Sequence, residues 1–481
     1  MTMANANPRH ECEVLDVIGV GFGPSNLGLA IALQEHNATA APGDRITARF
    51  VERQEKFGWH RGMLIEDATM QVSYLKDLVT LRNPTSPFTF LCYLKERERL
   101  VDFINYGSNF PTRLEFHDYL EWAAAQFAGS VDYGAEVEEI LPVRGEDGNG
   151  AVEHVDVVYR LGEQTVRLRA RNVVLATGLT PALPRGITAG ERVWHNKDLM
   201  HRAPELTGSA DSRSADAPLG APKRMAVIGA GQSAAETVDY LHRTFPDAEV
   251  YAVFARYGYS PADDSSFANR IFDPSAVDDF YTAPDGVKEM ILGYHANTNY
   301  SVVDPGLIDG LYRTHYHERV AGRERLKFCN VSRVADVVEV DDRVELAVES
   351  LIDGGREVIT ADVVVYATGY RASDPLWLLG GGLSEACGRD VAGRLDIRRD
   401  YRVGTDSLAD GTPVTAGIYL QGPTEHTHGI SSTLLSNLAV RSGEIAGSIV
   451  TGGASGSGRP AGAPAARGTA ATLPGVARTG G

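Results

Sequence analysis

The sequence predicts an α/β fold made of two units of the same kind. A short β-branched segment leads into a glycine-rich turn and a helix-like segment at Glu13–Glu35, and the same succession returns at Met225–Arg243. A strand-like segment also ends in Ala-Thr-Gly twice, at Asn172–Gly178 and at Asp362–Gly369. Strands that alternate with helices form mostly parallel sheets, so this repeat predicts two α/β units.

The composition limits the partners of the protein and its compartment. The 481 residues, enough for two or three domains, include 63 acidic and 46 basic side chains, which gives a formal net charge of −17. Nucleic acids and anionic membranes both bind basic surfaces, so neither is expected as a partner. The N-terminus does not resemble a signal peptide, and no apolar segment reaches the roughly 18–20 residues of a membrane span. We therefore expect a cytoplasmic protein.

The cysteines and histidines give no support to a metal or redox centre. The four cysteines, Cys12, Cys92, Cys329 and Cys387, lie far apart, without a Cys-x-x-Cys pair. Reduced thiols are therefore expected, rather than a reactive dithiol or a zinc ribbon. The pair His426 and His428 has no carboxylate or third histidine at ligand spacing, so no metal is expected.

The first glycine-rich turn has the pattern of a dinucleotide site. Its residues are Gly19, Val20, Gly21, Phe22, Gly23 and Pro24. The glycines permit a tight turn and let a pyrophosphate approach the amides at a helix N-terminus, although Pro24 replaces the usual third glycine. Glu52 ends the next predicted strand, where a carboxylate can bind ribose hydroxyls. It follows Gly19 by 33 positions, more than the roughly 20 expected, which predicts an extra loop at 37–44.

The second turn predicts a site for a different dinucleotide. Its residues are Gly229, Ala230, Gly231, Gln232, Ser233 and Ala234. The next predicted strand, Glu249–Phe254, ends without a carboxylate and leads to Arg256. An arginine at this place suits a 2′-phosphate, which favours NADPH over NADH. The alternative interpretation is that Arg256 is only a solvated surface charge.

Two dinucleotide units in one chain predict one cofactor that stays bound and one that delivers hydride. Three classes of flavoenzyme then compete. A disulfide reductase needs a dithiol beside the flavin, which the cysteine spacing does not provide. A ketone-oxidising monooxygenase would carry a Phe-x-Gly-x-x-x-His-type segment before the second turn, and residues 186–201 do not contain it. An N-hydroxylase remains.

Nine segments, in constant order over nearly the whole chain, point to one family. They are GVGFGPSNLGLA (19–30), FGWH (57–60), MQVSYLKDLVTLRNPTSPFTFLCYL (70–94), FPTRLEFHDYLEWAA (110–124), IGAGQSAAE (228–236), DDSSFANRIFDP (263–274), NTNYSVV (297–303), VVYATGY (364–370) and THGISSTLLSNLAVRSGEIA (427–446). Together they resemble the microbial L-ornithine and L-lysine N-monooxygenases of siderophore biosynthesis, which are flavin-dependent N-hydroxylases. The resemblance implies two Rossmann-like domains, for FAD and NADPH, and a smaller substrate-binding region.

The resemblance also implies the chemistry. NADPH reduces FAD, O2 adds as co-substrate to form a C4a-hydroperoxyflavin, and the side-chain amine of a small amino acid is hydroxylated while NADP⁺ is retained. Gln71 would lie against the flavin, with Trp59 and His60 lining it. The residues implied to hold NADP are Gln232, Ser233 and Arg256.

For the substrate, the resemblance implies that Lys76 pairs with the α-carboxylate. Asn269 and Asn299 would bind the backbone groups of the amino acid, and Ser431 or Ser432 would lie near it. Gln71, Lys76 and Asn299 are thus the implied catalytic residues. Without the resemblance, Lys76 would be interpreted as a lysine at the edge of a helix, and the two asparagines as turn residues.

Ornithine and lysine differ by one methylene, which is worth only about 1–3 kcal/mol in a pocket. The segments 110–122 and 297–303 look more like ornithine enzymes than lysine enzymes, so ornithine is expected. A diamine is less expected because Lys76 suits a carboxylate. A catalytically silent NADPH-binding sensor is the alternative from another class. The family also implies a homotetramer or another homo-oligomer.

These observations divide the chain into five parts. The expected parts are the first part of the FAD domain (12–202), a flexible linker (203–222), an NADPH domain (223–370) with a substrate-contacting insert (260–320), a return to the FAD domain with a substrate-site segment (371–450), and a disordered tail (451–481).

Overall fold

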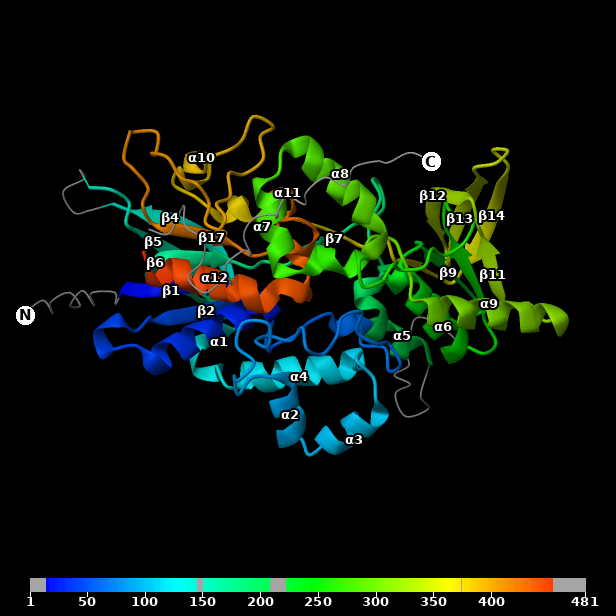
Figure 1. The fold of residues 1–481 in the computed structure, drawn as a ribbon. Coiled ribbons are helices and arrows are strands. Elements are labelled where there is room, and N and C mark those ends of the chain that lie inside the picture. The colour runs from blue at the N-terminus through cyan, green and yellow to red at the C-terminus, as the bar shows by residue number, and fades with distance from the viewer. Residues whose placement is uncertain (1–13, 145–149, 208–221, 373, 453–481) are drawn as a thin grey trace, which may run out of the picture.

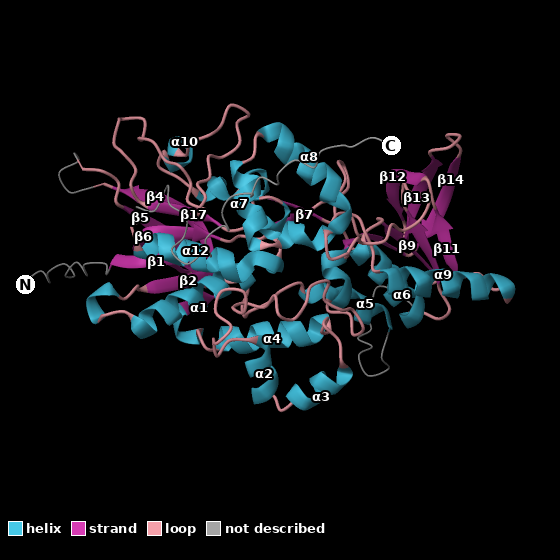
Figure 2. Ribbon diagram, in the orientation of Figure 1, coloured by secondary structure: helices cyan, strands magenta, loops and turns pink. Residues whose placement is uncertain are grey.

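A computed structural model describes residues 14–144, 150–207, 222–372 and 374–452. Two sheets lie at opposite ends of this part of the chain, with helices between and around them (Figures 1 and 2). The predicted fold class is confirmed: the protein has two α/β units with parallel sheets. No helix within the described ranges is long and apolar enough to cross a membrane.

The first sheet has the order β3-β2-β1-β6-β5-β4, and β17 also pairs with β6. Its strands are β1 (Val14–Val20), β2 (Ala48–Glu52), β3 (Val131–Tyr133), β4 (Ala135–Val143), β5 (His154–Leu161), β6 (Gln164–Leu175) and β17 (Gly417–Leu420). The strands β3, β2, β1, β6 and β17 are parallel, whereas β4 and β5 are antiparallel additions. The carboxyl ends of β1, β2, β6 and β17 therefore meet at one edge, where open α/β sheets bind their ligands.

The second sheet is parallel throughout, in the order β11-β10-β9-β15-β8. Its strands are β8 (Val193–His195), β9 (Arg224–Ile228), β10 (Glu249–Val253), β11 (Leu326–Cys329) and β15 (Val363–Tyr366). An antiparallel sheet of β12 (Ser332–Val340), β13 (Arg343–Ser350) and β14 (Arg356–Ala361) accompanies it. The two chain crossings between the units, β7 (Leu179–Pro181) and β16 (Tyr370–Ala372), pair with each other directly after the two Ala-Thr-Gly turns.

Twelve α-helices lie within the described ranges. They are α1 (Pro24–Thr39), α2 (Phe90–Glu96), α3 (Leu100–Tyr106), α4 (Arg113–Ala125), α5 (Leu199–Thr207), α6 (Gln232–Thr244), α7 (Pro274–Thr282), α8 (Asp285–His295), α9 (Pro305–Val320), α10 (Leu383–Ala386), α11 (Glu425–His428) and α12 (Leu438–Val450). Short 3-10 helices η5 (Ala268–Phe272), η6 (Ala296–Thr298) and η8 (Ile430–Thr433) belong to the segments expected to contact substrate.

Helix α1 explains two unusual features of the first glycine-rich turn: the proline at position 24 and the long spacing between Gly19 and Glu52. Pro24 is its first residue, a position that suits proline because the missing N–H would have no partner there anyway. The loop predicted at 37–44 begins later than expected: α1 continues to Thr39, and the connection that follows, with a 3-10 turn at Pro42–Asp44, leads to β2 at Ala48. The helix is this long because no glycine or proline stands between Gly28 and Pro42.

Two expected boundaries need correction. The linker cannot begin at residue 203, because α5 extends to Thr207 and buries Leu199, Ala203 and Leu206 along one face. β8 already pairs with β15 of the second sheet, so the chain enters that sheet before the boundary expected at residue 202. Residues 208–221 of the expected linker and 453–481 of the expected tail lie outside the described residues.

Candidate active site

The first glycine-rich turn is built for a close approach of backbones. Gly21 has a φ of +83°, and a Cβ placed on it would lie 2.4 Å from the carbonyl oxygen of Ala176. A Cβ placed on Gly23, directly before α1, would meet nothing within 4 Å. The buried Asn26 side chain donates to the Gly21 carbonyl at 2.7 Å and thereby fixes the turn. The open space at Gly23 lies at the N-terminus of α1, where a pyrophosphate would bind.

Glu52 closes the same turn from the end of β2. One carboxylate oxygen accepts from the Phe22 amide at 2.6 Å and the other accepts from the Gln54 amide at 2.8 Å. Only 8% of the residue is exposed. A carboxylate has about four acceptor sites, so two stay available for ribose hydroxyls.

Of the residues expected to line the flavin, His60 borders an open cavity, whereas Trp59 and Gln71 are not among its lining residues. The cavity has a volume of about 260 Å³ and is lined by Gln54, His60, Arg61, Gly62, Met63, Lys197, Asp198, His201 and Tyr370. The His60 ring lies edge-on to Trp59, 4.9 Å between centroids, and to Tyr370, 5.7 Å. Gln71 is exposed, in a bend that follows Met70.

His60 has an unusual backbone and a neutral ring. Its φ of +48° places it in the left-handed region, which is strained for a residue other than glycine. The residue is exposed toward the cavity, while protein surrounds its other sides. This environment desolvates the imidazolium, and Arg113 repels it, so the pKa of His60 falls to about 4. His60 therefore offers the cavity a neutral aromatic wall.

Four buried side-chain atoms between β17 and α12 have no hydrogen-bond partner among the described residues. They are Thr424 Oγ1, Ser432 Oγ, Ser436 Oγ and Asn437 Oδ1. An unsatisfied buried polar atom costs about 1–3 kcal/mol. Their segment begins at the carboxyl edge of β17, the same edge that carries the first turn. A polar ligand such as FAD with an amino acid fits this cluster, because it would supply the missing partners.

The structure brings Lys76 to the segment that contains Asn269. The Lys76 ammonium lies 5.4 Å from the centroid of the Phe272 ring, at the end of η5. Burial lowers the pKa of Lys76, and Asp273 opposes this shift. The ion pairs formed by lysines in the described ranges do not include Lys76. No helix covers residues 71–81, so the interpretation of Lys76 as a residue at the edge of a helix is wrong.

The other expected substrate residues lie around the same segment. Asn269 donates to the carbonyl of Asp264 at 2.6 Å, and η5 packs against η8, which carries Ser431 and Ser432. Asn299 follows η6, and the next residue, Tyr300, donates to the Glu425 carboxylate on α11. These contacts join the three segments from which the predicted substrate residues come.

The two serines are now distinguishable. Ser431 Oγ accepts from Asn437 Nδ2 at 3.1 Å, whereas Ser432 Oγ has no partner in the described chain. Ser432 is therefore the residue whose hydroxyl is available to a ligand.

The second turn is tied to its surroundings through side chains. A Cβ on Gly229 would lie 2.3 Å from the Ala367 carbonyl oxygen. Gln232 accepts from the Asp304 amide at 2.8 Å and donates to Glu236 at 3.0 Å, so both ends of its amide are engaged. Ser233, the second residue of α6, is partly buried. This turn thus holds Gln232 in a fixed orientation.

Arg256 is exposed and bends back over its own loop. One guanidinium nitrogen, Nη1, donates to the Ser260 hydroxyl at 3.1 Å and to the Ser301 carbonyl at 2.6 Å. These bonds hold the side chain beside the second turn without neutralising its charge. The charge stays available to an anion.

Two features of the site were not predicted. Arg113 of α4 forms a bidentate ion pair with Glu236 of α6, at 3.0 and 2.8 Å, which joins the first unit to the second. Arg441 of α12 contacts both Ser25, at the start of α1, and the Ser431–Ser432 segment. No local sequence pattern identifies either residue. Glu236 is 123 positions from Arg113, and Ser25 is 416 positions from Arg441.

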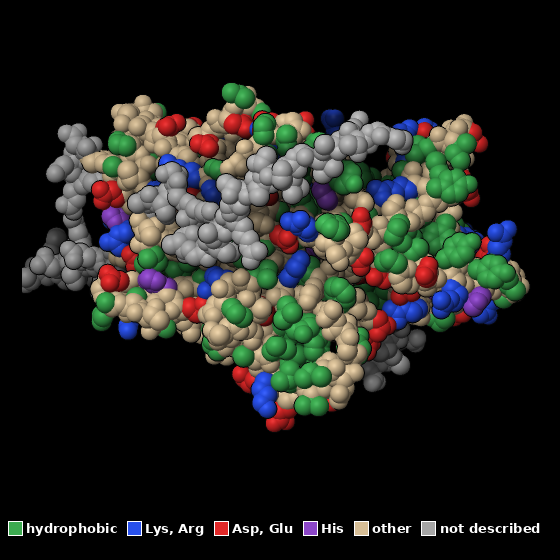
Figure 3. Space-filling model, in the orientation of Figure 1, with side chains coloured by type: hydrophobic (Ala, Val, Ile, Leu, Met, Phe, Trp, Pro, Cys, Tyr) green, Lys and Arg blue, Asp and Glu red, His purple; other side chains and the backbone are tan. Residues whose placement is uncertain are grey.

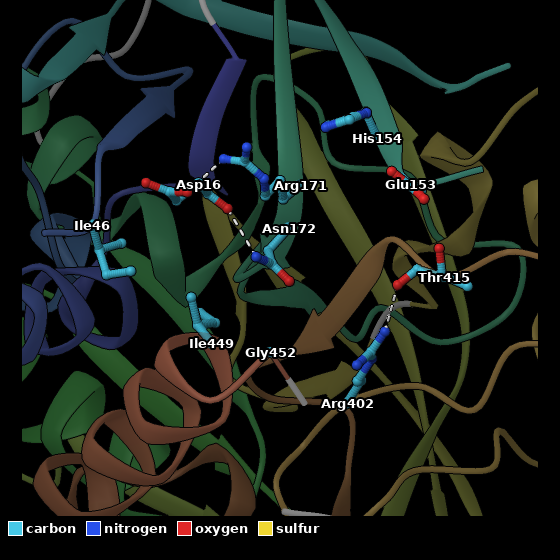
Figure 4. Close-up of a pocket in the computed structure, with 10 residues that line it drawn as sticks. All are labelled: Asp16, Ile46, Glu153, His154, Arg171, Asn172, Arg402, Thr415, Ile449 and Gly452. Atoms are coloured by element: carbon cyan, nitrogen blue, oxygen red, sulfur yellow. Dashed lines mark hydrogen bonds and ion pairs between the residues drawn. The ribbon is translucent and has the colours of Figure 1, made fainter. Parts of the chain in front are cut away.

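A second cavity, of about 240 Å³, lies at the opposite edge of the first sheet (Figure 4). Asp16, near the start of β1, receives bonds from Arg171 and Asn172, and Arg402 donates to the Thr415 carbonyl. Asp16 and Arg171 are thus paired with each other, whereas Arg402 is engaged by the backbone. The amino ends of parallel strands are not where such sheets bind cofactors, so this cavity is not part of the candidate site.

Comparison with known proteins gives consistent matches. The L-lysine 6-monooxygenase/L-ornithine 5-monooxygenase family matches residues 13–372. The L-ornithine N(5)-monooxygenase of Pseudomonas aeruginosa is 39% identical over 455 residues, which cover 93% of this chain and 96% of that protein.

Two solved structures extend the match to three dimensions. Kutzneria sp. 744 ornithine N-hydroxylase, KtzI with FADred, NADP+ and L-orn, is 46% identical with a TM-score of 0.82, covering 91% of this chain and 99% of its own. L-lysine 6-monooxygenase from Pseudomonas syringae is 30% identical with a TM-score of 0.75, with the same coverage of both chains.

Proposed function

Since the chain belongs to the L-lysine 6-monooxygenase/L-ornithine 5-monooxygenase family, we propose that it hydroxylates L-ornithine to N5-hydroxy-L-ornithine for hydroxamate siderophore biosynthesis. The protein is a flavin-dependent monooxygenase that uses FAD, NADPH and O2. Ornithine is favoured over lysine because the relatives named for ornithine are 39% and 46% identical, whereas the lysine enzyme is 30% identical.

The residues of the first unit would hold FAD. Gly21 and Gly23 would accommodate the diphosphate in front of α1, Glu52 would accept from the ribose, and Trp59 and His60 would line the ring system. Bound FAD, reduced by NADPH, supplies the activation of O2. The neutral His60 and the aromatic ring of Tyr370 would help to exclude water from that reaction.

One observation carries the choice of substrate: Lys76 is a partly buried cation without a carboxylate partner among the described residues. Burying a charge is costly unless an opposite charge accompanies it. The α-carboxylate of an amino acid supplies that charge, and Asn269, Asn299 and Ser432 lie on the segments around it. A diamine has no such group.

The distal amine must lose its proton before it can accept oxygen. An alkylammonium of pKa about 10.4 is only about 0.4% neutral at pH 8. Burial disfavours charged forms, and it lowers the pKa of Lys76, which supports desolvation of ammonium groups in this part of the site. We infer that the same desolvation assists deprotonation of the substrate.

The test is product formation with ornithine, lysine and putrescine, measured as hydroxylated amine per NADPH consumed. We expect coupled hydroxylation of ornithine, weak activity on lysine and none on putrescine. Equal coupling with lysine would assign the L-lysine activity instead. Activity on putrescine would contradict carboxylate recognition by Lys76, and NADPH binding without hydroxylated product would indicate a sensor.

We also propose that the protein is a cytoplasmic homotetramer. Apolar side chains gather over α2 and α3 and again over α9 (Figure 3). The members that are more than half exposed are Val101, Ile104 and Tyr106 in the first patch and Tyr312, Tyr316 and Val320 in the second. Exposed patches of this kind mark interfaces, and a D2 tetramer needs two different ones. The free thiols Cys92, Cys329 and Cys387 suit a reducing compartment.

Light scattering on charge variants tests the tetramer. Ile104→Glu and Tyr316→Glu should each give a dimer, and the double variant a monomer. A wild-type protein that is monomeric at micromolar concentration would contradict the proposal.

A further inference from the structure

Arg441 is a fully internal cation on α12. The residue is 2% exposed, yet its guanidinium contacts three different parts of the chain. Nη1 donates to the Ser432 carbonyl at 2.6 Å and more weakly to the Ser431 carbonyl at 3.5 Å. Nε donates to Gln421 Oε1 at 3.4 Å, and Nη2 donates to the Ser25 hydroxyl at 3.4 Å. Only the bond to Ser432 is short.

The charge of Arg441 has no counter-ion in contact. No carboxylate within the described ranges lies at ion-pair distance, and the nearby Glu444 is held by Arg399 through two bonds of 2.8 and 2.9 Å. Burial accordingly lowers the pKa of Arg441. An ionised group is seldom buried without an opposite charge. The long bonds from Nε and Nη2 leave donors that an anion could use.

The guanidinium lies next to the first glycine-rich turn. Gln421, which accepts from Arg441, donates to Asn26 at 3.0 Å and to the Ser25 carbonyl at 3.2 Å. Asn26 in turn holds the Gly21 carbonyl. Ser25 stands in the first turn of α1, in front of which a dinucleotide diphosphate would bind. The uncompensated cation thus faces the end of the fold that receives the anion.

We propose that Arg441 is a positioning residue that joins the FAD site to the substrate site. Its charge is balanced by the diphosphate of bound FAD, and its bond to the Ser432 carbonyl fixes the loop that presents the Ser432 hydroxyl. The inference rests on FAD binding at the first turn, as proposed above. FAD binding would thereby order the loop that contacts ornithine.

The experiment compares Arg441→Met with Arg399→Met, which removes another arginine of the same region but one that is paired with Glu444. FAD affinity is measured by flavin fluorescence, and melting temperature is measured with and without FAD. We expect Arg441→Met to weaken FAD at least tenfold and to leave the apoprotein as stable as wild type, because an apolar side chain replaces an unpaired buried charge. Arg399→Met should lower both melting temperatures equally and leave FAD affinity within twofold.

A second variant separates charge from geometry and remains informative if Arg441→Met does not fold. Arg441→Lys keeps the charge but loses the planar fork, so FAD affinity should stay within threefold of wild type while the ornithine KM rises at least fivefold. Flavin reduction by NADPH should be unchanged. FAD affinity within twofold for Arg441→Met, or equal loss of melting temperature with and without FAD, would overturn the proposal. The FAD affinities and melting temperatures do not require ornithine turnover, so these two readouts stand apart from the assigned activity.

Discussion

The two glycine-rich turns each connect a parallel strand to a helix, but they differ in the side chains that surround them. In the first turn, the fifth residue after Gly21 is the buried Asn26, which bonds its own turn and receives Gln421 from the C-terminal segment. After the second turn, Glu236 of α6 bonds Arg113 of the other unit. A side chain of α1 therefore braces the first site internally, whereas a side chain of α6 connects the second site to the neighbouring unit.

The acidic residue at the end of the second strand shows the same contrast. Glu52 is bound to the amide of Phe22, whereas β10 ends at Val253 and leads to the exposed Arg256. The first turn is thus closed on several sides, and the second is open beside a cation. This difference suits a flavin that stays bound and a nicotinamide cofactor that is exchanged. Glycine spacing thus identifies a dinucleotide site, whereas the residues around the turn distinguish one site from the other.

The largest expected effect tests whether the substrate site is independent of both turns. Lys76→Ala should raise the ornithine KM at least about 30-fold, because losing one partner of a desolvated charge pair costs about 2–5 kcal/mol. FAD and NADPH affinities should remain within twofold. Steady-state kinetics checks this, with the exposed Lys95→Ala as the control. An unchanged ornithine KM would remove Lys76 from the substrate site.

The second effect tests whether the Glu52 carboxylate, which closes the first turn, contributes to FAD binding. Glu52→Ala should weaken FAD by about 10- to 100-fold, because hydrogen bonds to a charged group are worth about 1.5–3 kcal/mol. NADPH affinity should not change. Fluorescence titration of the apoprotein measures this, with the exposed neighbour Glu55→Ala as the control. Equal losses for both cofactors would show that Glu52 acts on the whole fold rather than on the first turn.

Arg256 tests the open character of the second turn. Arg256→Ala should raise the NADPH dissociation constant by about tenfold, the low end for a charge-assisted bond because the side chain is exposed. The NADH value should stay constant, since NADH lacks the 2′-phosphate. Titration with both cofactors checks this, and Arg313→Ala on α9 is the matched exposed control. Loss of NADH affinity to the same extent would assign Arg256 to the structure of its loop.

Much of this comparison was predictable from the sequence, because the features of both turns depend on residues that are close together in the chain. The turns at Gly19 and Gly229, the strands that precede them and the absence of a carboxylate after β10 all depend on neighbours in the chain. The end of α1 at Thr39 was missed because helix length depends on where a breaker stands, rather than on the apolar pattern alone. The placement of β8 in the second sheet could not be read from three residues, since only its partner β15 identifies it.

The connections between segments were beyond local patterns. Gln421 and Asn26 are 395 positions apart, and Arg113 and Glu236 are 123 positions apart. Polar side chains such as these look like ordinary surface residues in the sequence. Their roles become visible only when the fold buries them, because burial turns an unpaired polar group into a costly one.

The smallest expected effect concerns the ion pair between Arg113 and Glu236, which connects the second turn to the first unit. Arg113 and Glu236 are largely buried and bidentate, whereas another pair between the units, Arg243 with Asp67, is exposed. Exposed pairs contribute about 0–1 kcal/mol, so only the buried pair should hold the second turn against the flavin. Glu236→Gln keeps the shape of the side chain but loses its charge. The rate of flavin reduction by NADPH should fall about threefold, while FAD affinity stays constant.

A double-mutant cycle with Arg113→Gln decides whether the pair acts as a unit. Residues in one ion pair show coupling of about 0.5–3 kcal/mol, so the double variant should reduce flavin no more slowly than Glu236→Gln alone. Stopped-flow absorbance measures the reduction, and Arg243→Gln should have no effect. Additive losses in the cycle would mean that Glu236 acts through Gln232, its neighbour in the second turn, rather than through the first unit. The two turns would then differ only in their local surroundings, and the second would no longer depend on Arg113.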